Sequence, residues 1–196
     1  MTCARICQLR EWGSLFSAAF NTVSSERSQD RISFEGLAAH AKEITIQDGH
    51  HVPILIVEGS RRLAVSHIQE MPETHGERLR LMQLFGQAAA ESGKFGRLEQ
   101  IFFVSEGWMS VAAQENPPSI RPSQDPERKE VLIVSGLEAR GRRTRLRIFE
   151  MVRNGAQEVL DLPELSSPQA GEATAQVPLL DAFVQGFALA FQARVS

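Results

Sequence analysis

Two tight turns between strand-like segments constrain the fold of this chain more than any other feature. The runs "VPILIVEG" and "RRLAVSHIQ" flank Gly59 and Ser60, and the runs "EVLIVSGLEAR" and "RTRLRIFEMVR" flank Gly141. A short glycine-containing turn between two apolar runs is typical of a β-hairpin, whose strands are antiparallel. The sequence therefore predicts a sheet built mainly from hairpins rather than from β-α-β crossovers.

Three segments with helical periodicity surround these strands. Ser33 is a plausible N-cap for an apolar stripe over Phe34–Ile46, which Gly49 ends. A second amphipathic helix is predicted over Pro72–Gly93, and a third over Leu179–Phe191. Each helix has one apolar face to bury, and the sheet is the surface available for it.

The run "RLEQIFFVSEGWMSVA" supplies a central strand, with a bend or bulge expected at Gly107. A short edge strand is expected over residues 154–162. We therefore predict an α+β fold, with a largely antiparallel sheet of five to six strands and helices packed mainly on one face.

The front of the chain differs from the rest. Trp12, Phe16 and Phe20 recur at helical spacing and a polar, serine-rich stretch follows, so residues 1–31 are predicted to be a helical appendage with a linker. Residues 32–196 are predicted to form a single α+β domain. No apolar run approaches the length needed to cross a membrane, and we expect no membrane contact. Only Cys3 and Cys7 are present, and the N-terminus lacks the apolar core of a secretory signal, which favours a cytoplasmic protein.

The histidines offer no clear metal site. The "DGHH" turn, Asp48–His51, sits between a helix and a strand, with His67 expected on the neighbouring strand. Adjacent residues of a strand point to opposite faces, so His50 and His51 are poorly placed to share an ion. The chain also lacks the glycine-rich phosphate motifs and the G-x-S-x-G nucleophile motif, and we expect no metal and no cofactor.

A candidate pocket is predicted where one strand ends and another begins. It contains Glu106, Trp108, Asp125 and Arg128. A metal-dependent nuclease would use carboxylates such as Glu106 and Glu127 with Lys129, but the spacing fits such sites poorly. The alternative is structural: Trp108 covers the proline-rich loop of residues 116–128, and Glu106 anchors that loop by pairing with Arg128.

A row of arginines follows on the second hairpin. Arg143, Arg145 and Arg147 share one face of their strand, since side chains alternate along it. Three guanidinium groups in a row could follow a phosphate backbone, but the solvated outer face of an antiparallel sheet accounts for the same pattern and is the favoured interpretation. The net charge of −3 means that a nucleic-acid partner requires such a local patch.

The stretch "VSEGWMS" followed by "DPERKEVLIVSG" resembles an uncharacterised family of bacterial and phage proteins. Those proteins carry Ser-Glu-Ala-Trp at a strand end, a proline-rich loop, and then Asp-Pro-x-Arg-x-Glu leading into a strand. Gly107 stands here in place of the alanine, and the resemblance spans about residues 33–138. It implies a shared fold and no particular activity.

From these features we expect a protein that acts by binding rather than by catalysis. A homodimer through an apolar terminal helix, over Trp12–Phe20 or Leu179–Phe191, is the expected assembly. Two alternatives stay open: a metal-dependent hydrolase, and a nucleic-acid-binding module that uses the Arg140–Arg147 hairpin.

Overall fold

A computed structural model describes residues 31–110, 122–140, 143–165 and 177–195. The appendage predicted at the N-terminus lies outside these ranges, except for its last residue, and so does most of the proline-rich loop. Within the described ranges, no helix is both long enough and apolar enough to pass through a bilayer.

The structure is organised around a five-stranded sheet in the order β2-β1-β3-β4-β5, and all neighbouring strands are antiparallel. The strands are β1 (Ile54–Gly59), β2 (Leu63–His67), β3 (Leu98–Met109), β4 (Lys129–Glu138) and β5 (Arg143–Glu150). The two predicted hairpins are β1–β2 and β4–β5, and the predicted antiparallel α+β fold is confirmed.

The central strand β3 is unbroken along its pairing with β4. The register runs from Gln100 opposite Glu138 to Met109 opposite Lys129, with Gly107 opposite Val131 and no shift between. The bulge expected at Gly107 is therefore wrong, because a continuous ladder with β4 holds the glycine in ordinary strand geometry.

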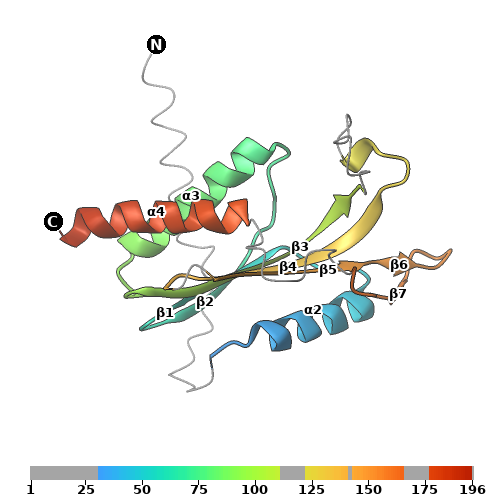
Figure 1. Cartoon of the computed structure of the whole chain (residues 1–196), viewed down its shortest axis with the longest axis horizontal. Helices are drawn as coiled ribbons and strands as arrows, with labels where there is room; N and C mark the ends of the chain where they lie inside the picture. The colour runs from blue at the N-terminus through green and yellow to red at the C-terminus, as the bar shows by residue number, and fades with distance from the viewer. Residues whose placement is uncertain (1–30, 111–121, 141–142, 166–176, 196) are drawn as a thin grey trace, which may run out of the picture.

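Helices cover both faces of the sheet (Figure 1). Helices α3 (His75–Glu91) and α4 (Pro178–Val195) pack together on one face, while α2 (Phe34–Asp48) lies on the other. The expectation of helices mainly on one face thus holds for α3 and α4, and α2 is the exception. Strands β1 and β3 explain the arrangement, since Leu55 and Phe103 face one helical layer while Ile56 and Phe102 face the other.

The helix ends follow from local sequence. Ser33 caps α2, its Oγ accepting a hydrogen bond from the Gly36 N–H at 3.4 Å, and α2 ends at Gly49 with a left-handed φ of 74°. Thr74 and Glu77 form a capping box at the start of α3, which begins a few residues later than predicted.

The segment after β5 does not extend the main sheet as a regular strand. Strand β6 (Val152–Arg153) pairs with β7 (Val159–Asp161) in a separate two-stranded sheet, and a single bridge joins Phe149 to Glu164. The edge strand expected over residues 154–162 is therefore half of this small hairpin, which packs beside α2. A short 3-10 helix, η1 (Pro122–Gln124), precedes β4.

Candidate functional site

A pocket of about 490 Å³ opens where the start of α2 meets β3, β4 and β5. Its size lies within the range of small-molecule and cofactor sites. Phe34 and Phe102 form an apolar part of its wall, with ring centroids 6.4 Å apart. The charged residues of the wall are Arg31, Glu99, Glu138, Arg140, Arg143 and Arg145.

Arginine outnumbers acid in this pocket. Glu99 is shared by two arginines, since it lies 3.0 Å from Arg31 and 3.6 Å from Arg140. Arg145 lies 3.3 Å from Glu138, and its guanidinium also sits 5.8 Å from the centre of the Phe34 ring. Among the described residues of the wall, four guanidinium groups meet two carboxylates, which leaves an excess of two positive charges (four minus two).

The three arginines predicted to share a strand face do so, but they are used differently. Arg143 is exposed and has no ion-pair or hydrogen-bond partner among the described side chains. Arg147 lies beyond the pocket and binds Glu35 at 2.6 Å and also Glu164. The hydrogen bond with Glu164 raises the pKa of Arg147, which joins α2 to the segment after β7. Arg143 and Arg145 therefore line the pocket, whereas Arg147 stabilises the fold through its ion pairs.

Three of the four residues predicted for the other pocket lie together at the end of β3. The Arg128 guanidinium lies 4.5 Å from the centre of the Trp108 ring, which is a cation–π contact. Arg128 also donates to the Asp125 carbonyl at 3.1 Å, and the Asp125 carboxylate accepts from the Glu127 N–H at 2.9 Å. Trp108 remains 44% exposed, so the contact covers one part of its ring.

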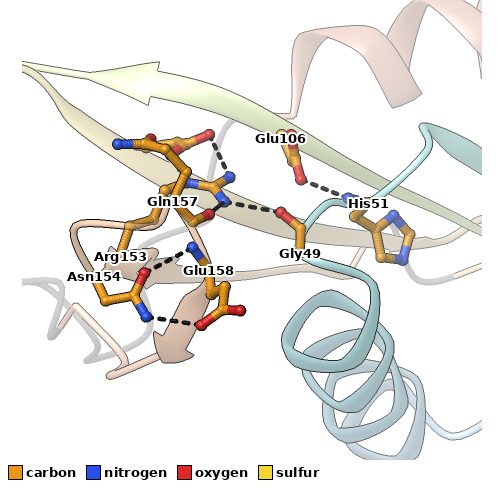
Figure 2. A network of polar contacts seen from close by, with 8 residues as sticks. Gly49, His51, Glu106, Arg153, Asn154, Gln157 and Glu158 are labelled. Atoms are coloured by element: carbon orange, nitrogen blue, oxygen red, sulfur yellow. Dashed lines mark hydrogen bonds and ion pairs between the residues drawn. The ribbon is translucent and has the colours of Figure 1, made fainter.

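Glu106 is not part of this group, and its carboxylate lies beside the end of α2 (Figure 2). Its carboxylate accepts a hydrogen bond from the backbone N–H of His51 at 2.5 Å. Burial raises the pKa of Glu106, and the neighbouring Glu130 adds to this rise, while the His51 N–H and Arg153 oppose it. The proposed pairing of Glu106 with Arg128 is therefore not present. Arg128 lies one residue beyond the last pair of the β3–β4 ladder, about 13 Å along the strands from Glu106.

Arg153 is the residue of this region that the sequence did not single out. Its guanidinium binds both carboxylate oxygens of Glu130, at 2.6 and 2.9 Å, and donates to the carbonyls of Gly49 and Gln157 at 2.9 and 2.8 Å. Figure 2 shows it reaching from β6 toward the end of α2. These groups come together only because β6 pairs with β7 and the small hairpin packs on α2. No short sequence motif predicts these contacts of Arg153.

In the Asp48–His51 turn, both histidine rings contact backbone carbonyl groups. The Nδ1–H of His51 donates to the Val52 carbonyl at 2.8 Å, and His50 Nδ1 lies 3.0 Å from the Asp48 carbonyl. Burial lowers the pKa of His51. Across the described ranges, no three histidine, cysteine or acidic side chains are grouped so that they could hold a metal ion.

These observations define a class of protein: an α+β domain with an arginine-lined pocket between a helix start and a sheet. Residues 12–188 match the family described as bacteriophage lambda protein ea47, and because the match covers most of the chain, the protein belongs to that family. The resemblance to an uncharacterised family of phage proteins is confirmed to this extent, while the Ser-Glu-Ala-Trp pattern stays a prediction. Comparison with curated proteins and with solved structures finds no match.

Proposed function

We propose that this protein is a non-catalytic binding domain that holds the phosphate backbone of a nucleic acid at the arginine pocket. The observation that carries the proposal is the excess of arginine over acid around the pocket, with Arg143 left exposed and unpaired within the described part of the chain. On a chain with a net charge of −3, this is a local patch of the kind that a polyanion requires.

The geometry suits phosphate for two reasons. Guanidinium groups bind phosphate oxygens through paired hydrogen bonds, and Arg143 and Arg145 project side by side from alternate positions of β5. The pocket also lies at the start of α2, where the helix dipole adds positive potential. A bound phosphate competes with Glu99 and Glu138 for the arginines, so binding is expected to be moderate rather than tight.

Of the three residues considered for a hydrolase, Glu106 and Lys129 make structural contacts and Glu127 is exposed, which favours binding over catalysis. Lys129 forms an ion pair with Glu150 at 2.7 Å, and Glu106 is bound by the His51 backbone. Trp108 and Arg128 hold each other at the end of β3. The expected cytoplasmic location accords with a nucleic-acid ligand and belongs to the same proposal.

The proposal is tested by fluorescence anisotropy with short labelled oligonucleotides: single-stranded DNA, single-stranded RNA and duplex DNA. We expect binding at low ionic strength that weakens steeply as salt is added. Arg143→Glu should weaken binding about tenfold and reduce the slope of log affinity against log salt by about one, because one phosphate contact is lost.

Arg97→Glu is the matched control, because Arg97 is exposed and lies outside the pocket wall. It should bind as the wild type does. Polyglutamate serves as a carboxylate polyanion and should compete poorly. The proposal fails if no oligonucleotide binds at low salt, if Arg143→Glu and Arg97→Glu behave alike, or if polyglutamate competes as well as DNA.

A further inference from the structure

A second hollow, of about 900 Å³, lies between α3 and α4 on the side of the molecule opposite α2. Both helices run the same way across the sheet (Figure 1). The hollow runs from their first turns toward the point where they touch. We call it the α3–α4 groove. It is lined by Gly76, Leu79, Arg80, Gln83, Leu84, Gln87, Pro178, Asp181, Ala182 and Gln185.

The lining residues recur at helical spacing on both helices. On α3 they follow the i, i+3, i+4, i+7 pattern that marks one face of a helix, and on α4 they do the same. This face adjoins the buried face of each helix: Ala182 belongs to the core cluster that contains Phe85 and Phe183, and Leu79 packs against it. Leu79, Leu84 and Ala182 give the groove an apolar floor between the polar residues of the two helices.

The polar groups of the groove are unused by the rest of the described chain. Arg80, from α3, and Asp181, from α4, carry opposite charges, and neither side chain has an ion pair or hydrogen bond with a described residue. The side-chain amides of Gln83, Gln87 and Gln185 are also unbonded within that part of the chain. An amide carries both donors and acceptors.

We infer that the α3–α4 groove is where two copies of this chain associate, through a two-fold axis. A two-fold interface places a surface against itself, so the surface must be self-complementary. The groove meets this condition, since it carries one cation, one anion and amides that donate and accept. In the pair, Arg80 of each copy faces Asp181 of the other. An acidic or a basic partner would satisfy only one of the two charges.

The experiment is a charge exchange between two variants of the full chain, followed by sedimentation velocity. We expect the wild type to form a concentration-dependent dimer. Arg80→Asp and Asp181→Arg should each weaken self-association by at least about tenfold, because each places like charges opposite one another twice. An equal mixture of the two variants should associate about as well as the wild type, because in the mixed dimer every such pair is again of opposite charge.

Circular dichroism melts of the variants at low concentration monitor folding. Both variants should melt in one cooperative transition, because neither side chain has a partner within the described chain, and Asp181→Arg should melt slightly lower because it places a cation in the first turn of α4. Arg143→Glu is the control, and it should leave self-association unchanged while it weakens oligonucleotide binding. This separates a failure of this inference from a failure of the proposed function.

Three results would overturn the inference. The first is a wild type that stays monomeric at high concentration, as it would if a segment of the same chain or another protein fills the groove. The second is single variants that dimerise as the wild type does. The third is a mixture that associates no better than its components.

Discussion

Glu106 shows how a carboxylate can lower the stability of a fold while it organises a turn. It accepts the His51 N–H and so fixes the chain after α2, yet it lies partly buried and close to Glu130. Its pKa is raised above the ordinary value of 4.5, chiefly by burial. The folded protein therefore binds this proton more tightly than the unfolded chain, and stability falls as pH rises from 4.5 through the raised pKa.

We expect Glu106→Gln to keep the hydrogen bond and remove this pH dependence. The glutamine carbonyl oxygen can accept from the His51 N–H, and it carries no charge at any pH. The difference in melting temperature, variant minus wild type, should be about 1–3 °C larger at pH 7 than at pH 4. Differential scanning calorimetry at both values measures this.

The exposed Glu127 provides the control. Glu127→Gln measures what the loss of one exposed carboxylate does to the melting temperature at each pH. A Glu106→Gln variant whose difference from the wild type does not change between pH 4 and pH 7 would contradict the assignment.

At the level of elements, α3 and α4 approach each other through two glycines. A Cβ added to Gly86 would lie 2.0 Å from the Phe183 carbonyl oxygen, and one added to Gly186 would lie 2.0 Å from the Gln83 carbonyl oxygen. Both obstacles are backbone atoms, so a rotamer change cannot relieve them. Arg194 strengthens the same pair, since it donates to the last carbonyls of α3 at Ala90 and Glu91.

Gly86→Ala should therefore destabilise the protein by about 2–3 kcal/mol, because the helices must separate. This exceeds the gain in helix propensity from replacing glycine by alanine. Gly36→Ala is the control: its Cβ would lie in ordinary contact, 3.7 Å from Ser33 Cβ, and it should be neutral or stabilising by up to about 1 kcal/mol. Urea unfolding measures both. A Gly86→Ala variant as stable as the control would contradict the close crossing.

The elements themselves were predictable because their signals are local. Turn residues and apolar runs identified the β1–β2 and β4–β5 hairpins, and Ser33 and Gly49 marked the ends of α2. The sequence predicts helices mainly on one face of the sheet and so does not place α2 on the other face, although the composition of β1 indicates this position. The run Ile54–Val57 is apolar at every position, which is typical of a strand buried on both faces.

The candidate site was predictable only in part, for a geometric reason. Strand alternation placed Arg143 and Arg145 together, because that relation is local. Arg31 and Glu99 join them from distant parts of the chain, and their place depends on the register of β3 and on where α2 begins. No spacing in the sequence encodes either quantity.

At the scale of the molecule, the described residues form two cores that share one sheet. Strand β3 contributes to both, since Ile101 and Phe103 pack under α3 and α4 while Phe102 and Val104 pack against α2. Neither layer of helices can bury its apolar face without that strand. The physical consequence is that the two sides of the sheet should unfold together, as the predicted single domain over residues 32–196 requires.

Phe102→Leu and Phe103→Leu test this coupling, because the two changes are chemically identical and act on opposite faces. Each should cost about 1–2 kcal/mol and lower the midpoint of one shared thermal transition by a few degrees. Calorimetry should give equal calorimetric and van't Hoff enthalpies for both variants. Two separate units would instead give two transitions, with Phe102→Leu moving only one and Phe103→Leu only the other. Because β3 is one continuous strand with a large ring on each face, a single transition that responds equally to either change is the expected result.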